Sequence, residues 1–129
     1  MLSWLLVFLG GGAGAVARYG AGTAWLRLAG PQHPWAATLL INTAGGLLMG
    51  VLIAVLALRG GAASGERWRL LLGVGALGGF TTFSTFSLET TGMLMRRAYG
   101  LALGYSLASV MLSTAACWAA LVLLRRAVP

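Results

Sequence analysis

Two glycines, five hydroxyl groups, three phenylalanines and one carboxylate lie within twelve residues of the sequence, GGFTTFSTFSLE (78–89). Hydroxyl groups donate hydrogen bonds to anions, and the edge of an aromatic ring attracts them by its partial positive charge. If the second half of the stretch is helical, Phe83 and Phe86 lie three residues apart and share a face. The stretch is therefore a candidate anion site. Ordinary packing against neighbouring helices is the alternative for the two rings.

Other hydrogen-bonding side chains occur at helical spacing within apolar runs. Thr38 and Asn42 are four residues apart, and the Asn42 amide can donate to an anion or offer its carbonyl to a cation. Tyr105, Ser109 and Ser113 recur at every fourth position, which predicts a track of hydroxyls along one helix face. An interhelical hydrogen bond for Asn42, and bonds from the serines to their own helix, are the alternatives.

Arg18 lies well inside the first apolar run, in the sequence GGGAGAVARYG. A charge at membrane depth is expensive, so its presence needs a reason. Either the long side chain reaches the membrane interface, or it faces a water-filled vestibule where its charge attracts anions. No acidic residue lies nearby in the sequence to pair with it.

The sequence offers little to an enzyme or a metal cluster. Cys117 is the one cysteine and His33 the one histidine, and Glu66 and Glu89 are the two acidic residues. This set excludes an intramolecular disulfide and supplies no nucleophile with its base and no catalytic pair of carboxylates. The net charge of +7 comes from arginines in runs of two at most, which argues against nucleic-acid binding.

The elements that position these residues are predicted to be membrane helices. The chain is 59% hydrophobic and 9% charged, whereas about a quarter of the residues of a soluble domain are charged. Four apolar segments, about 2–28, 35–58, 68–95 and 100–124, each reach the ~20 residues that a span requires. We therefore predict an all-α integral membrane protein with a single four-helix domain over residues 1–129. RGGAASGERWR, between the second and third segments, is the clearest loop.

The third segment is too long for one straight span. As a single helix it would be about 42 Å long, against a hydrocarbon core of about 30 Å. A break at Gly78-Gly79 would resolve the excess, so we expect the third helix to be broken near Gly78–Thr82. Non-helical backbone survives at membrane depth only where it is buried in protein or lines a cavity. Its freed carbonyls can bind a small cation.

Two features bear on assembly. Gly10 and Gly14, like Gly46 and Gly50, form GxxxG spacings that serve either packing within the chain or oligomerisation. With four spans, the side that holds both termini carries five arginines and the other side three. The first group is Arg59, Arg67, Arg69, Arg125 and Arg126; the second is Arg27, Arg96 and Arg97. So weak a positive-inside bias permits insertion both ways round, and hence an antiparallel dimer.

At this point the motifs match a known family. The chain resembles the Fluc (CrcB) fluoride channels of bacteria over essentially its whole length. The matching pieces are GGGAGAVARY in the first span, ATLLINTAGGLLMG in the second and GALGGFTTFSTFSLET in the third. The second piece has Ala37-Thr38 and Gly45-Gly46 where the family often has Gly-Thr and Gly-Ser, which are changes between small residues.

The resemblance implies a fluoride-selective channel in the bacterial inner membrane. Such a multi-pass protein would let cytoplasmic fluoride leave down its gradient through two pores of an antiparallel, dual-topology homodimer. The family's pore residues correspond to Asn42, Phe83 and Phe86, with Ser109, Ser113 and Tyr105 along a polar track; Thr38, Ser84 and Thr85 are assigned to the pore with them. Arg18 corresponds to the vestibule arginine.

The resemblance also implies a structural Na⁺ at the dimer centre. By motif position, the backbone carbonyls of Gly78 and Thr81 would hold it. The expected partners are thus fluoride, a second copy of the chain and the lipid bilayer. Glu89 matches an acid of the family motif without an evident role, and Phe80 falls outside the pore pair.

Two other functions are compatible with parts of the sequence. A small multidrug exporter coupled to protons is also a short four-span dimer, but it needs a carboxylate in the first span, where this chain has Arg18. A non-conducting assembly subunit would leave the polar faces of Asn42 and Ser109 without a purpose. The sequence therefore favours passive anion conduction.

Overall fold

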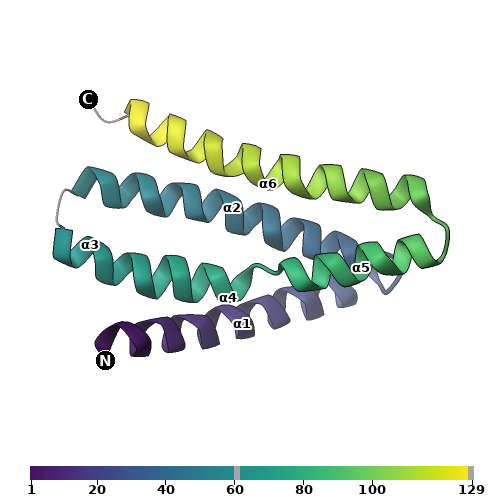
Figure 1. The fold of residues 1–129 in the computed structure, drawn as a ribbon, viewed down its shortest axis with the longest axis horizontal. Coiled ribbons are helices and arrows are strands. Elements are labelled where there is room, and N and C mark those ends of the chain that lie inside the picture. The colour runs from purple at the N-terminus through teal and green to yellow at the C-terminus, as the bar shows by residue number, and fades with distance from the viewer. Residues whose placement is uncertain (60–61, 128–129) are drawn as a thin grey trace.

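A computed structural model of the chain describes residues 1–59 and 62–127, and every regular element in these ranges is helical (Figure 1). In chain order the elements are α1 (Leu2–Ala29), α2 (Pro34–Arg59), α3 (Ala62–Trp68), the π-helix η1 (Arg69–Leu77), α4 (Gly78–Phe80), α5 (Phe83–Met95) and α6 (Tyr99–Ala127). Four stretches are long and apolar enough to cross a membrane: Leu2–Ala29, Pro34–Leu58, Gly65–Met95 and Tyr99–Arg126. The protein is thus an all-α, four-span membrane protein.

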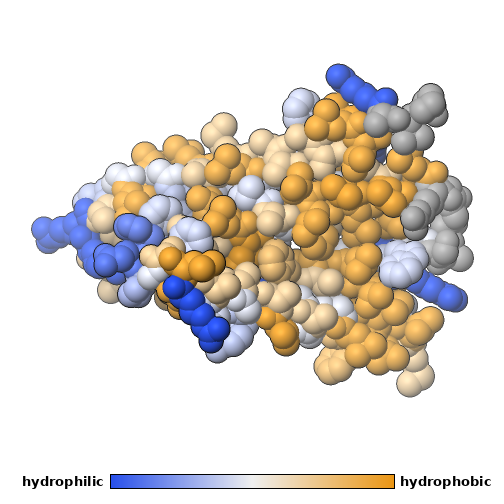
Figure 2. Space-filling view, turned by 180° about the vertical axis from the view of Figure 1, so that it is seen from behind, coloured by the Kyte–Doolittle hydropathy of each residue, from blue (hydrophilic) through white to orange (hydrophobic). Residues whose placement is uncertain are grey.

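The four spans run side by side along the long axis of the molecule (Figure 1). The start of α1, the end of α6 and the junction of α2 with α3 lie at one end, and the connections α1–α2 and α5–α6 lie at the other. Apolar side chains cover most of the middle of the face seen in Figure 2, with hydrophilic ones mostly towards the ends. This distribution suits a bilayer, in which the apolar middle faces lipid tails.

The turn between α1 and α2 follows from its glycine and proline. Gly30 has φ 75°, a left-handed conformation that glycine adopts without strain, and its N–H donates to the Leu26 carbonyl to close α1. Pro34 is the first residue of α2, where its fixed φ suits a helix and its missing N–H is not needed.

Both GxxxG spacings are used within the chain. A Cβ atom on Gly10 or Gly14 would collide with the carbonyl oxygen of Leu71 or Ala76, so α1 touches the backbone of η1 directly. Gly46 and Gly50 meet α6 in the same way, at the backbone of Ser113 and Cys117. Of the two uses left open by the sequence, the structure shows packing within the chain.

The third span is interrupted, but not at the predicted glycines. Gly78 has helical dihedral angles (φ −63°, ψ −39°), and the helix continues to Phe80. Thr81 (φ −80°, ψ 159°) and Thr82 (φ −151°, ψ 118°) are extended, and α5 starts at Phe83. The break thus lies within the expected range Gly78–Thr82, about two residues after Gly78-Gly79, the pair expected to cause it. Gly79 instead lets α4 approach α1, since a Cβ there would collide with the Gly11 carbonyl oxygen.

The predicted loop between the second and third spans is shorter than expected. Gly60 and Gly61 lie outside the described residues, but Ala62–Trp68 forms α3, contrary to the loop prediction for RGGAASGERWR. Glu66 and Arg69 explain part of the difference. Their charged groups are 2.7 Å apart, an i, i+3 ion pair that favours a helix.

Candidate functional site

The site is built around the two extended residues at the break. The N–H and the hydroxyl of Thr81 both donate to the Leu77 carbonyl, each at 3.0 Å, which ends α4. The hydroxyl oxygen of Thr82 accepts the N–H of Thr85 at 3.2 Å and so caps the N-terminus of α5. The break thus ends one helix at Phe80 and starts the next at Phe83, with Thr82 as the N-cap of the second.

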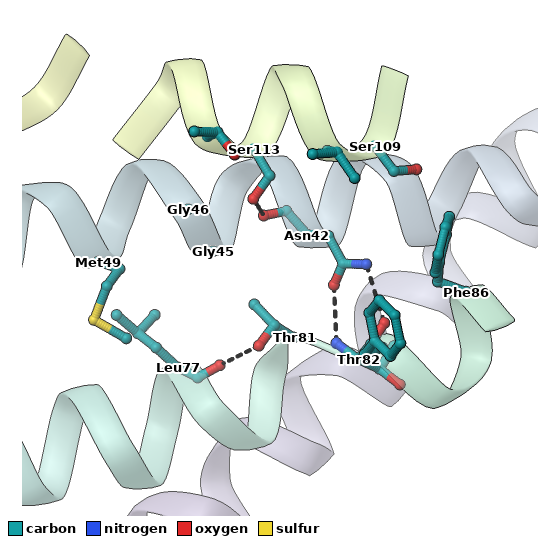
Figure 3. Close-up of a pocket in the computed structure, with 13 residues that line it drawn as sticks. Asn42, Gly45, Gly46, Met49, Leu77, Thr81, Thr82, Phe86, Ser109 and Ser113 are labelled. Atoms are coloured by element: carbon teal, nitrogen blue, oxygen red, sulfur yellow. Dashed lines mark hydrogen bonds between the residues drawn. The ribbon is translucent and has the colours of Figure 1, made fainter. Parts of the chain in front are cut away.

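Asn42 on α2 holds the break from one side. Its side-chain oxygen accepts the Thr82 N–H at 2.8 Å, and its amide nitrogen donates to the Thr82 carbonyl at 3.0 Å (Figure 3). This pair of bonds satisfies backbone groups that cannot be left unpaired at membrane depth. One amide hydrogen of Asn42 is used in this way, and the other remains for a ligand.

Arg18 on α1 holds the break from another side. Its Nε donates to the Gly79 carbonyl oxygen at 3.1 Å, and the side chain is partly buried. One interpretation from the sequence was that this side chain reaches the membrane interface. In the structure its Nε is instead bound to the break. The guanidinium uses one of its five N–H groups on the helix end, and the other four have no hydrogen-bond partner among the described residues.

The end of α4 carries backbone carbonyls that are available to a ligand. Among the described residues, no hydrogen bond from outside a helix reaches the carbonyls of Gly78, Phe80 or Thr81, whereas Gly79 has Arg18. A helix C-terminus is negative and an N-terminus positive, so the end of α4 favours a cation and the start of α5 favours an anion. One interruption therefore offers sites of opposite preference a few residues apart.

A cleft of about 410 Å³ opens beside the break, between α2, α5 and α6 (Figure 3). Its lining includes five of the predicted pore residues: Asn42, Phe83, Phe86, Ser109 and Ser113. Thr81, one of the two predicted cation ligands, also lines it, whereas Gly78 and Ser84 do not. Residues far apart in the sequence thus meet at one hollow in the middle of the molecule.

The two serines that face the cleft differ in their contacts. The hydroxyl of Ser113 donates to the Asn42 backbone carbonyl at 3.0 Å. Ser109 is 8% exposed, and its hydroxyl has no hydrogen-bond partner among the described residues. A buried donor without a partner is unfavourable by about 1–3 kcal/mol, which a bound ligand would relieve.

The aromatic rings lie side by side. The ring centroids of Phe83 and Phe86 are 5.3 Å apart with a 43° angle between planes, and Phe86 lies 5.2 Å from Tyr105. Both pairs are tilted, between the parallel and the edge-to-face arrangements. Phe83 is 77% exposed in the single chain, so one wall of the cleft is open.

Tyr105 and Thr38 meet at Glu89, which sequence reasoning left without a role. The Tyr105 hydroxyl donates to one carboxylate oxygen of Glu89 at 2.6 Å, and the Thr38 hydroxyl donates to the other at 3.0 Å. The hydroxyl of Tyr105, from the predicted track, and that of Thr38, from the predicted pore set, are therefore both bound to a carboxylate in this arrangement. Their residues come from α6 and α2, which no spacing within one helix could have linked to α5.

A second hollow of about 280 Å³ lies on the other side of the break. Arg18, Thr38 and Thr85 line it together with Thr82. The predicted vestibule arginine thus shares a cavity with two predicted pore residues. Ser84 lines neither hollow; it is exposed, and its hydroxyl contacts that of Thr82 at 3.2 Å.

The residues of the site that were not assigned to it from the sequence include Glu89, Thr82 and Thr114. Thr82 and Thr114 line the first cleft, and Thr82 connects Asn42 to the α5 cap. The signal for Thr82 was present, because it is the last hydroxyl before a helical phenylalanine pair, where an N-cap is expected.

Comparisons with known proteins agree on one family. The family described as "CrcB-like protein, Camphor Resistance (CrcB)" matches residues 5–121. The chain is 59% identical over 126 residues to the "Fluoride-specific ion channel FluC" of Phenylobacterium zucineum (strain HLK1), covering 98% of each chain. It is 56% identical over 126 residues to the protein of the same name from Caulobacter sp. (strain K31), covering 98% of this chain and 97% of that protein. A third relative of that name, from Agrobacterium fabrum, is 46% identical over 123 residues, or 95% and 96% of the two chains.

Proposed function

This chain belongs to the CrcB-like family, and from that premise we propose that it is a fluoride-specific ion channel. It is not an enzyme, and its four apolar spans make it a multi-pass protein of the bacterial inner membrane. Fluoride moves through it passively, from the cytoplasm down its electrochemical gradient.

The observation that carries the proposal is the cleft beside the break. It combines a buried hydroxyl without a partner on Ser109, the remaining amide hydrogen of Asn42, and the rings of Phe83 and Phe86. The positive N-terminal end of α5 adjoins it. All of these favour an anion, and none of the lining side chains carries a charge that would trap one.

Conduction requires that an ion lose part of its water and then leave again. Fluoride is small and strongly hydrated, so it needs close donors to replace its water. Several moderate contacts in series, here hydroxyl, amide and ring edges, let it enter without binding too tightly. Arg18, four of whose guanidinium N–H groups have no partner in the described part of the chain, concentrates anions at the second hollow before they reach the cleft.

Two chains in antiparallel orientation form the working channel, with two pores per dimer. The support is that Phe83, a pore ring, is 77% exposed in the single chain, so a second copy is needed to close the cleft against lipid. The near balance of arginines between the two ends, five against three, supports insertion both ways round.

A structural Na⁺ at the dimer centre is the proposed cofactor. The carbonyls of Gly78 and Thr81 fit this role because they lie in the last turn and at the C-cap of the continuous η1–α4 helix, where the helix is negative, and receive no described hydrogen bond from outside a helix. Bound there, the ion would supply positive charge that holds the two broken helices together. Oxygen ligands suit Na⁺, and among the described residues no group of three His, Cys, Asp or Glu offers an alternative metal site.

The test is efflux from liposomes that contain the purified protein. We expect rapid loss of fluoride and little loss of chloride. Phe83→Ile keeps an apolar side chain of similar size but removes the ring edge, so fluoride flux should fall while the dimer persists on size-exclusion chromatography. Equal fluoride and chloride fluxes, or no fluoride flux from an intact dimer, would refute the proposed function.

A further inference from the structure

A continuous row of aromatic rings joins the α1–α2 turn to the cleft. The centroids of His33 and Trp35 are 5.7 Å apart, and those of Trp35 and Tyr105 are 5.6 Å apart. Tyr105 then contacts Phe86 at 5.2 Å, and Phe86 contacts Phe83 at 5.3 Å. The row therefore begins at one end of the bundle and ends at the rings beside the break.

Tyr105 is the central member of this row and is held at both its ring and its hydroxyl. It is 3% exposed and belongs to a buried cluster with Met93 and Ala102, against which Trp35 and Phe86 pack. Its hydroxyl is fixed on Glu89 at 2.6 Å. The cluster confines the ring, and Trp35 adds a contact with a defined angle, since it meets the ring edge to face with 60° between planes.

Trp35 belongs to a helix face that touches the site at three places. Trp35, Thr38 and Asn42 follow one another at i, i+3 and i+7, so they lie on one side of α2. Thr38 holds Glu89 and Asn42 holds Thr82. Trp35 completes the series by contacting the ring of Tyr105, although it lines neither hollow.

We propose that Trp35 is a positioning residue of the pore: its indole fixes the ring plane of Tyr105, and Tyr105 in turn sets the tilt of Phe86 and the ring edge that faces the anion. Trp35 donates nothing to fluoride itself. The expected effect of Trp35 on fluoride flux rests on the proposed function. The contact between the Trp35 and Tyr105 rings does not depend on that function.

The chemistry requires a ring at position 35 rather than bulk. An aromatic edge is positive and is attracted to the face of a second ring, which defines an angle, whereas an aliphatic side chain packs without a preferred angle. Trp35→Phe should therefore keep the function, and Trp35→Leu should lose it. Trp35→Met, whose flexible side chain fills irregular gaps, serves as a second ring-free variant should the leucine protein fail to fold.

The experiment combines flux with a direct view of Tyr105. In a Tyr19→Phe, Tyr99→Phe background, 3-fluorotyrosine labels Tyr105 alone, and ¹⁹F NMR reports the order of its ring. We expect one narrow resonance in the parent and in Trp35→Phe, and a broadened or split one in Trp35→Leu and Trp35→Met. In liposomes, the ring-free variants should pass fluoride about fivefold to tenfold more slowly and discriminate less against chloride, with Trp35→Phe within about twofold of the parent.

Trp4→Leu is the matched control. Trp4 lies in the first turn of α1 and is 83% exposed, so it should change neither the resonance nor the flux. A single narrow resonance and normal flux in Trp35→Leu would overturn the inference, as would equal damage in Trp35→Phe. Absence of fluoride flux from the parent would instead refute the proposed function, while the resonance would still decide whether Trp35 orders Tyr105.

Discussion

At the scale of single residues, the two serines that face the cleft from α6 carry different expectations. Ser109 has a buried hydroxyl without a described partner, whereas the hydroxyl of Ser113 is bound to the Asn42 carbonyl. Ser109→Ala should lower fluoride flux by about tenfold because it removes an available donor. Ser113→Ala, the matched control, should lower it by less than about twofold, since that carbonyl lies within α2 and is not left unpaired. Liposome efflux measures the fluoride flux of both variants. Equal losses of flux would show that the two serine hydroxyls contribute equally, contrary to this expectation.

Asn42 carries a second prediction at this scale, because its amide has two roles that substitution can separate. Asn42→Ala leaves the Thr82 N–H and carbonyl without their side-chain partner. The free energy of unfolding should therefore fall by about 2–4 kcal/mol, and fluoride flux should fall as well. Asn42→Asp keeps an oxygen for the Thr82 N–H but places a negative charge beside the cleft. We expect it to retain more stability than the alanine variant while abolishing flux. Thermal unfolding in detergent, paired with efflux, checks both; a conducting Asn42→Asp channel would contradict this assignment.

Periodicity predicted which of these residues share a helix face, but not what they touch. Spacings of four aligned Ser109 with Ser113 and Thr38 with Asn42, and all four residues line a hollow in the structure. The contacts of Glu89 with Thr38 and Tyr105 join three helices. Such contacts depend on how far each helix is displaced along its neighbour, which no single-helix pattern encodes.

At the scale of elements, the close contact of α1 with η1 and α4 determines where the third span can break. Gly14→Ala places a methyl group against the Ala76 carbonyl, so it should push the helices apart and lower the free energy of unfolding by about 1–3 kcal/mol. Gly12→Ala is the control: its Cβ would meet nothing within 4 Å in the described chain, and alanine favours a helix. The change in melting temperature relative to the parent protein should therefore differ in sign or size between the two variants. Equal changes would argue against the close contact.

The position of the break shows how packing overrides local preference. Two adjacent glycines are the strongest helix-breaking signal in the third span, yet Gly78 and Gly79 are helical. Gly79 is needed for close approach to α1, while Asn42 and the Thr82 cap supply the partners that extended backbone requires. The existence of a break was predictable from length alone. Its exact residues depended on partners from other helices.

At the scale of the whole molecule, the proposal of dual topology predicts a labelling pattern. In a Cys117→Ala background, Arg67→Cys and Arg27→Cys place single thiols at opposite ends of the bundle, both exposed. If the chain inserts both ways round, a membrane-impermeant reagent added from one side should label about half of the molecules of each variant. Labelling of all molecules of one variant and none of the other would exclude an antiparallel dimer. Total thiol content after detergent solubilisation is the control for access.

The central claim is that the break and its cleft conduct fluoride passively, and one electrical measurement tests it most directly. With the protein in a planar bilayer and both anions on both sides, each gradient is varied in turn. The reversal potential should follow the fluoride gradient, by about 59 mV for each tenfold change, and should not follow the chloride gradient. It should not respond to a pH gradient, because no proton-carrying carboxylate lies in the first span. A reversal potential that follows chloride equally well, or one that moves with pH, would contradict a passive fluoride channel.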